Sequence, residues 1–267
     1  MPPLEIMLLV FSLFFFLASS GLFVGGFHPS QRANLLSRLA QMGFVAGTLT
    51  VTLMPFFNVS SSGIWLCIVL GWLSIIAWRF WNLGLIGTFM SPIVSLILLL
   101  DSFFATNSFY AFGSMPASDW FSIKIHIGSA VIGQAFAAIA CSISLLLLWQ
   151  ERKLKSRDLI SLPSSYPAMK TLASSLSTTL WIGFTFITIS LITGAIVVKT
   201  SHVTAISLTP KIAWAIMVWA WYLSILVLAK ILSYRPHKIA RMSLVGFALL
   251  ALSWFGMAFT WNWGYGS

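Results

Sequence analysis

The chain has 267 residues, of which 59% are hydrophobic and only 7% are charged, and its mean hydropathy is +0.95. Soluble domains carry roughly 25% charged residues, so this composition excludes a soluble globular protein and predicts an all-α integral membrane protein. The formal net charge is +10, but the basic residues lie in short segments between apolar runs. Membrane topology explains that pattern, and we therefore expect no nucleic-acid partner.

Eight apolar runs follow one another along the chain. At about 1.5 Å of rise per residue, about twenty apolar residues cross a hydrocarbon core of roughly 30 Å, so each run is expected to form one transmembrane helix. The first run has no basic segment before it and is expected to be an uncleaved span. The prediction is one polytopic domain over residues 1–267, a bundle of about eight helices with spans at residues 4–27, 35–57, 63–80, 83–100, 123–149, 172–198, 212–232 and 242–261.

The charges between the runs orient these spans. Twelve Lys or Arg residues belong to the side that holds Gln150–Asp158, whereas the other side has Lys124, Lys199 and Lys211. Because basic loops stay in the cytoplasm, we expect the first side to be cytoplasmic and both chain termini to lie outside. The expected location is the inner (plasma) membrane of a bacterium, with the lipid bilayer around the bundle.

Two pairs of glycines are candidates for helix contacts. Gly21 and Gly25 lie in the first expected span, and Gly43 and Gly47 lie in the second. Each pair has the G-x-x-x-G spacing, which lets membrane helices approach closely, so we expect both pairs at helix interfaces.

No arrangement of residues typical of an enzyme is present in the sequence. The five acidic residues are scattered, and no nucleotide-binding loop, zinc-protease motif or nucleophile elbow occurs. Cys67 and Cys141 form neither C-x-x-C nor C-x-x-C-H, which argues against a thiol relay or covalent heme attachment. The spans hold almost no ionisable residue, which disfavours proton-coupled transport. We therefore expect a protein that is not an enzyme.

Histidine is the remaining residue type with informative chemistry. His126 begins a long apolar span at its outer end, and His202 lies in an outer connection on the same side. The connection between the fourth and fifth spans is rich in Phe, Tyr and Trp, so it is expected at the membrane interface or over a hydrophobic ligand. Two neutral imidazoles near such a region are what bis-histidine heme iron needs. A purely structural role for His126 stays open.

Several segments carry a family resemblance. The stretch from His126–Ser129 to Trp149–Lys155 resembles the cytochrome c assembly family, the CcsA/HemX type of heme-handling membrane protein, in which a histidine opens a helix that ends in a Q-E-[RK]-x-L-K-like segment. Leu191–Gly194 is similar to part of the family's next helix. Thr209–Ala215, followed by Trp219, is similar to the family's D-P-K-E-T-W-A-x-x-x-W. The resemblance covers roughly residues 65–255.

The chain departs from the family pattern in two places. The tryptophan-rich W-G-x-x-W-x-W-D signature is missing from the segment before Pro210. The second external histidine, expected near the C-terminus, is replaced around Trp261–Trp263. The chain is therefore more similar to the HemX/YpjD-like branch than to a full heme-exporting subunit.

The resemblance implies a non-enzymatic protein that binds or presents heme at the outer (periplasmic) face. His126 is then the candidate ligand of the heme iron, and His202 is the candidate for the second axial position. The heme-pocket candidates are lysines that pair with the propionates and tryptophans that stack on the macrocycle: Lys124, Lys211, Trp120, Trp214 and Trp261. Other membrane or cytochrome-assembly proteins are the expected partners.

Two other functions are compatible with the same sequence. The first alternative is a non-heme structural or regulatory membrane subunit that acts through protein partners, and the missing tryptophan signature favours it. A small-molecule transporter is the third possibility, although the spans lack the buried charges that transporters use.

Overall fold

The computed structural model describes residues 3–26, 33–57, 62–81, 86–104, 120–156, 168–200, 205–231 and 235–264. Within these ranges the backbone forms eight α-helices and one 3-10 turn, η1 (Met54–Phe57), so the predicted all-α class is confirmed. The helices are α1 (Pro3–Gly26), α2 (Ala33–Leu53), α3 (Ser62–Trp81), α4 (Ile86–Phe104), α5 (Trp120–Lys155), α6 (Met169–Thr200), α7 (Ala205–Lys230) and α8 (Pro236–Gly264).

Several helices run past the apolar runs that predicted them. Helix α5 has 36 residues, about 54 Å at the usual helical rise, and includes the basic segment up to Lys155. Helix α7 begins at Ala205, before Pro210, and not near residue 212. Hydropathy locates only the part of a helix that crosses hydrocarbon, whereas the backbone hydrogen bonds continue into the polar interface.

Four helices are long and apolar enough to cross a membrane, judged on the described residues. The crossing segments are Gly63–Phe80, Phe121–Lys155, Met169–Lys199 and Ile212–Lys230. Helices α1 and α4 contribute the shorter apolar segments Ile6–Leu22 and Phe89–Ser102. Helices α2 and α8 carry polar and basic side chains near their starts, which lowers their hydropathy. The other four expected spans therefore stay predictions.

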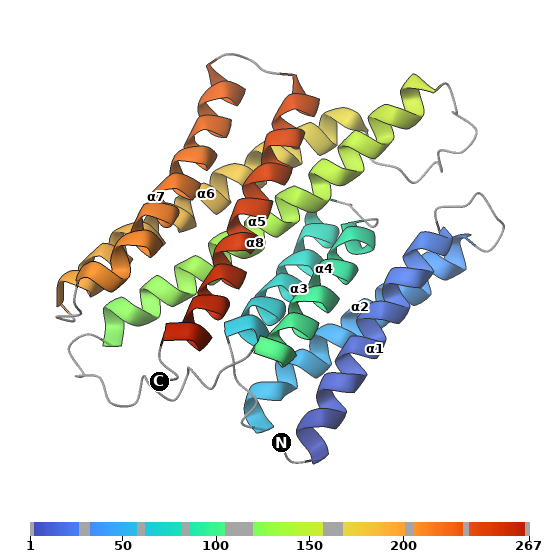
Figure 1. Cartoon of the computed structure of the whole chain (residues 1–267). Coiled ribbons are helices and arrows are strands. Elements are labelled where there is room, and N and C mark those ends of the chain that lie inside the picture. Colours follow the sequence, from blue (N-terminus) through green and yellow to red (C-terminus); the bar gives the residue numbers. More distant parts are fainter. Residues whose placement is uncertain are drawn as a thin grey trace.

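The helices form two groups that meet at α5 (Figure 1). Helices α1 to α4 pack together on one side, and α5 to α8 form the other, with α5 and α6 as their most extensive pair. Helix α5 also contacts α3, α4 and α8, so it is the element that joins the two groups. Both chain ends lie at the same end of the bundle (Figure 1). The side of the membrane that this end faces stays a prediction.

Glycines bring α5 and α6 into close contact. A Cβ at Gly133 would lie 2.9 Å from Ile187 Cγ1 and 3.1 Å from the Ile187 backbone nitrogen. A Cβ at Gly183 would lie 3.1 Å from the Cβ of Phe136. Small residues at facing positions let membrane helices pack backbone to backbone, and α6 is therefore held firmly against the face of α5.

The two predicted glycine pairs behave differently. A Cβ at Gly47 would lie 3.1 Å from the Phe16 ring, and one at Gly43 would lie 3.5 Å from the Phe15 carbonyl oxygen, so this pair packs against α1 as expected. Gly21 has nothing within 4 Å of its Cβ position, so its predicted interface role is wrong. The G-x-x-x-G spacing identifies a smooth helix face but not its occupancy by a neighbour. The side-chain position of Gly25 lies outside the described residues.

Candidate functional site around His126

The imidazole of His126 is held by helix α6. His126 lies near the start of α5 and is half-buried. Its Nδ1 is 2.8 Å from the backbone carbonyl oxygen of Ser190, 64 residues further along the chain. The Ser190 hydroxyl lies 3.3 Å from the same nitrogen and donates to the His126 carbonyl oxygen at 3.3 Å. His126 of α5 and Ser190 of α6 are thus joined by hydrogen bonds in both directions.

This contact determines the tautomer of the ring. A carbonyl oxygen only accepts hydrogen bonds, so Nδ1 must carry the proton and donate it to Ser190. In the neutral imidazole the lone pair then lies on Nε2. A ring with Nδ1–H donated to a backbone carbonyl and Nε2 unprotonated is the arrangement that histidine metal ligands adopt.

Gly194 makes the room for the ring. A Cβ at this position would lie 2.8 Å from Cε1 and 2.9 Å from Nδ1 of His126. Ser190 and Gly194 are four residues apart on α6, so they lie one above the other on the same helix face. The carbonyl group of Ser190 accepts from the imidazole, and the absence of a side chain at Gly194 leaves space for it. We call these two residues the imidazole seat.

The backbone of α5 at His126 is also fixed, by hydrogen bonds from Ser129 in the next turn of the helix. The Ser129 hydroxyl is buried and donates to the carbonyl oxygens of Ile125, at 2.6 Å, and His126, at 3.1 Å. The His126 carbonyl therefore accepts hydrogen bonds from Ser129 and from Ser190. The backbone that carries the imidazole is fixed as firmly as the ring itself, which favours a rigid ligand position.

The other predicted site residues come from helix ends near His126, but most of their side chains lie outside the described residues. Trp120, Lys211 and Trp261 belong to α5, α7 and α8, whose ends nearest to them lie together in Figure 1, but their side chains are outside the described residues. The whole of His202 is outside the described residues. Lys124 is exposed and, two residues before His126, leaves α5 about 160° away from it around the helix.

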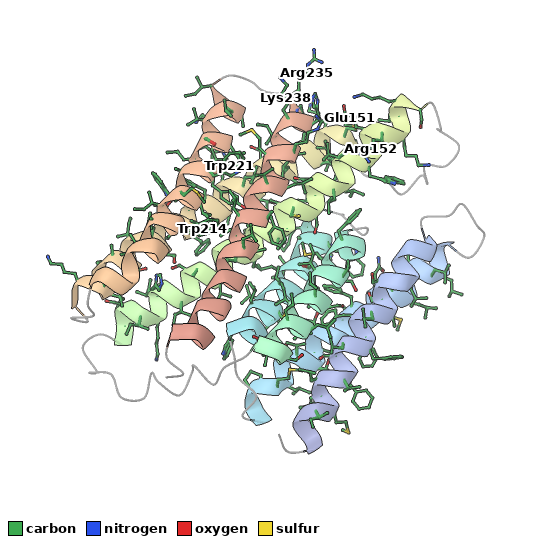
Figure 2. All side chains as sticks on the ribbon, viewed as in Figure 1. Glu151, Arg152, Trp214, Trp221, Arg235 and Lys238 are labelled. Carbon is green, nitrogen blue, oxygen red and sulfur yellow. The ribbon has the colours of Figure 1, made fainter. Side chains whose placement is uncertain are left out.

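Trp214 joins two helices. Its ring is half-buried, and its indole Nε1 donates to the Leu249 carbonyl oxygen of α8 at 3.3 Å. Trp221, two turns further along α7, donates in the same way to the Met242 carbonyl oxygen at 3.1 Å (Figure 2). Both tryptophans therefore hold α7 against α8.

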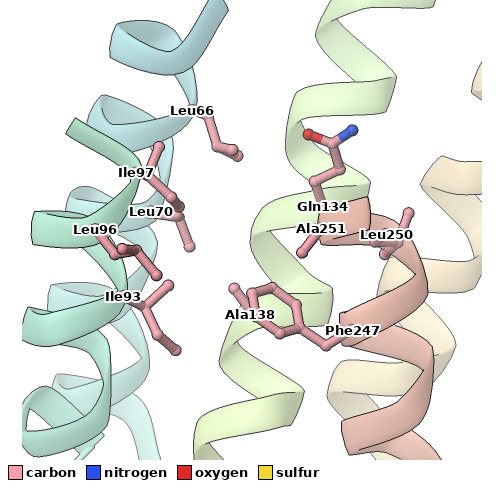
Figure 3. A pocket seen from close by; sticks show the side chains of 10 residues that line it. All are labelled: Leu66, Leu70, Ile93, Leu96, Ile97, Gln134, Ala138, Phe247, Leu250 and Ala251. Atoms are coloured by element: carbon pink, nitrogen blue, oxygen red, sulfur yellow. The ribbon is translucent and has the colours of Figure 1, made fainter. Parts of the chain in front are cut away.

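A second candidate ligand site is an apolar cavity of about 90 Å³ in the middle of the bundle (Figure 3). Helices α3, α4, α5 and α8 line it with Leu66, Leu70, Ile93, Leu96, Ile97, Gln134, Ala138, Phe247, Leu250 and Ala251. None of these side chains ligates iron. Gln134 is eight residues from His126, about 12 Å along α5, so the cavity and the imidazole seat are separate places.

The described residues contain no group of three or more His, Cys, Asp or Glu that would hold a metal ion by themselves. One imidazole with an unprotonated Nε2 does fit one axial position of a heme, because the porphyrin supplies the other four ligands. The residues present therefore fit a heme contact better than a protein-only metal site.

Ser190 and Gly194 are the site residues that sequence reasoning missed. Gly194 ends the Leu191–Gly194 segment that carried part of the resemblance, so a signal for it was present. Ser190 acts through its backbone carbonyl, which every residue has, and no sequence pattern points to such a group.

Four helices long enough to cross a membrane, judged on the described residues, define a multi-pass helical membrane protein, and His126 is held by a neighbouring helix at one end of it. The model of the family described as cytochrome c assembly protein matches residues 56–262, more than half of the chain. The chain therefore belongs to the cytochrome c assembly protein family, as its motifs predicted, and the family gives it a role in cytochrome c biogenesis. No curated protein and no solved structure matches it.

Proposed function

We propose that this protein binds heme in cytochrome c biogenesis, with His126 Nε2 as an axial ligand of the iron. The observation that carries the proposal is the imidazole seat: the Ser190 carbonyl orients the ring and fixes its tautomer, and Gly194 leaves space for it. Bound heme would supply the iron and a large apolar, anionic macrocycle. The protein's part is to hold and present it, so we propose no enzymatic activity.

We propose the outer, periplasmic side for this presentation. The end of the bundle that holds His126 also holds Lys124 and Lys199, whereas the basic residues from Arg152 to Lys155 and from Arg235 to Arg241 lie at the opposite end. Basic segments stay on the cytoplasmic side, which puts His126 outside. The same rule makes the bacterial inner membrane the proposed location.

The remaining heme contacts are proposed from residues near the helix ends around His126. His202, in the segment between α6 and α7, is the proposed second axial ligand. Trp120, Trp261 and Trp214 are proposed to shield the macrocycle. Lys124 and Lys211 are proposed to pair with the propionates, since an ammonium group stabilises a carboxylate in a partly apolar setting.

An absorption spectrum of the purified protein, oxidised and reduced, tests the proposal. A Soret band with sharp reduced α and β bands is expected, alone or after heme is added. The band should be lost or strongly shifted in His126→Ala. The matched control is His237→Ala, which removes a histidine at the other end of the bundle and should leave the spectrum unchanged. An unchanged spectrum in His126→Ala contradicts the proposal.

The alternative is a non-heme structural or regulatory subunit that acts through a protein partner. Two observations favour it: the indole N–H of Trp214 is already used between α7 and α8, and α6 exposes a broad apolar face that includes Trp181, Ile192 and Ile196. A stoichiometric partner that co-purifies with protein lacking heme, and a featureless visible spectrum after heme addition, would decide for this alternative.

A further inference from the structure

The end of the bundle opposite His126 gathers positive charge from two helices that are distant in sequence. Five of its six Lys or Arg side chains are exposed, and the sixth, Lys153, is half-buried. Figure 2 shows Arg152, Arg235 and Lys238 at this end beside Glu151. We call this set the basic end cluster: Arg152, Lys153, Lys155, Arg235, Lys238 and Arg241.

Glu151 lies within the basic end cluster and joins α5 to α8. Its Oε1 is 2.7 Å from Lys155 Nζ and 3.8 Å from His237 Nδ1, and Arg241 also acts on it electrostatically. Arg152 follows Glu151 in the chain and Arg241 acts on the same carboxylate from α8, so two exposed guanidinium groups from different helices gather around Glu151. Like charges near each other repel, and this repulsion is relieved when an anion binds between them.

Aromatic rings set the depth of the basic end cluster in the membrane. Lys153 Nζ lies 5.9 Å from the centre of the Trp149 ring, and Lys230 Nζ, at the end of α7, lies 5.7 Å from the ring of Trp181 in the first half of α6. Tryptophans with cations beside them are typical of the boundary between hydrocarbon and headgroups. The basic end cluster, one turn beyond Trp149, is therefore at the level of lipid phosphates.

We propose that the basic end cluster binds the phosphate of an anionic phospholipid. Arg152 and Arg241 come from different helices and are exposed, and a guanidinium binds phosphate oxygens in a bidentate manner that suits this headgroup. Each Lys or Arg at a membrane surface strengthens binding to anionic lipid about fivefold, so several of them together select such a lipid over a zwitterionic one.

The course of α5 explains why the anion is a lipid and not a soluble phosphate. Ala138, Leu145, Trp149 and Arg152 share one face of the helix, and Leu145 and Trp149 are half-buried. Along this face Arg152 lies about 21 Å from Ala138, which lines the partly open apolar cavity of Figure 3, and the hydrocarbon depth of one leaflet is roughly 15 Å. A phosphate at Arg152 therefore places an acyl chain along α5, with its end in the cavity.

Competition between two lipids with identical acyl chains tests this site. The purified protein in mild detergent is offered phosphatidylglycerol and phosphatidylcholine, and the retained lipid is counted by mass spectrometry of the intact complex. We expect selective retention of phosphatidylglycerol, reduced about 30-fold in the double variant Arg152→Gln/Arg241→Gln. Glu151→Gln should strengthen retention about fivefold, since it removes the negative charge within the cluster.

The matched control is the double variant Arg38→Gln/Arg79→Gln, which removes two exposed arginines of α2 and α3 at the same end of the bundle. It should retain phosphatidylglycerol as the unmodified chain does. An equal loss in both double variants, or equal retention of both lipids, overturns the proposal in favour of a general surface charge. Displacement of the lipid by millimolar inorganic phosphate also overturns it, in favour of a soluble anion. The test uses no heme, so its outcome is independent of the proposed function.

Discussion

The side chain of His126 has a defined direction and a defined tautomer, with the proton on Nδ1. The ring is constrained on two sides, by the Ser190 carbonyl that accepts from Nδ1 and by Gly194, which lies against its Cε1 edge. An Nδ1–H donated to a backbone carbonyl is the orientation that histidine metal ligands share, which is why the proposed function is placed at this ring.

Gly194→Ala should displace the imidazole while leaving every candidate ligand in place. The added methyl group would lie within 3 Å of two ring atoms, so the ring must turn away from Ser190. Loss of such an orienting contact typically weakens metal binding 10- to 100-fold, and we expect a loss of this size in heme titrations followed at the Soret band. Gly128→Ala is the control, because its Cβ position on α5 is open. Equal affinity in both variants would show that ring position is unimportant.

Ser190→Ala should have a much smaller effect. The variant loses the hydroxyl that donates to the His126 carbonyl, but the Ser190 carbonyl that accepts from Nδ1 is retained. One such hydrogen bond contributes about 1 kcal/mol, so a small fall in melting temperature and nearly unchanged heme affinity are expected. A heme defect as large as that of Gly194→Ala would mean that the hydroxyl, and not the carbonyl, holds the ring.

At the scale of elements, the pairing of α5 and α6 positions the site. His126 and the imidazole seat are on different helices, so any change in the packing of these helices moves the His126 ring relative to Ser190 and Gly194. The close contact at Gly133 and Gly183 lies two to three turns from the seat, and the Phe136 and Phe186 rings stack between the same helices at 6.3 Å. The imidazole seat therefore depends on residues that do not contact the His126 ring.

Gly133→Ala should loosen this pair. Its Cβ would meet the backbone nitrogen of Ile187 at 3.1 Å as well as the side chain at 2.9 Å, and backbone cannot turn away as a side chain does. Overpacking of this kind costs about 1–3 kcal/mol, and we expect a lower melting temperature in detergent together with weaker heme binding. Gly21→Ala, at a position with nothing within 4 Å, should leave both unchanged. A Gly133 variant as stable as the Gly21 variant would contradict this account of the α5–α6 contact.

For the whole molecule, the two proposed sites lie on opposite sides of the membrane, and the proposed periplasmic presentation of heme depends on which side faces out. The imidazole seat and the basic end cluster lie at opposite ends of α5, so one faces the periplasm only if the other faces the cytoplasm. Helix α5 also contacts both helix groups, and the match to the family begins at residue 56, after α1 and the whole of α2. The family region is thus the part of the molecule organised around α5.

Cysteine labelling in intact cells tests that orientation. Lys199→Cys, exposed at the end of α6 near His126, should react with a membrane-impermeant maleimide from outside, whereas Ser156→Cys, exposed at the end of α5, should react only after the membrane is opened. The native Cys67 and Cys141 are buried, so background labelling should be low. The reverse labelling pattern would place His126 in the cytoplasm and contradict the proposed periplasmic presentation of heme.

The sequence by itself determined the helical class and the family, it predicted eight apolar runs where the described residues form eight helices, and it singled out His126 as a candidate. Those properties depend on composition, on runs of apolar residues and on local motifs, all of which act over a few helical turns. The helix ends were less predictable, as α5 and α7 show. Hydropathy identifies the part of a helix that crosses the hydrocarbon, and not the residue at which its hydrogen-bonded backbone begins or ends.

Only the tertiary structure decided what His126 contacts. Its partner is a backbone carbonyl 64 residues away, and its neighbour is a glycine whose role is the absence of a side chain. The joining of α5 to α8 through Glu151 and His237 is equally non-local. Such contacts depend on how two helices cross and on which faces they turn to each other, and this is set by packing between distant segments. The sequence predicts His126 as a candidate ligand, but the orientation of its ring required the fold.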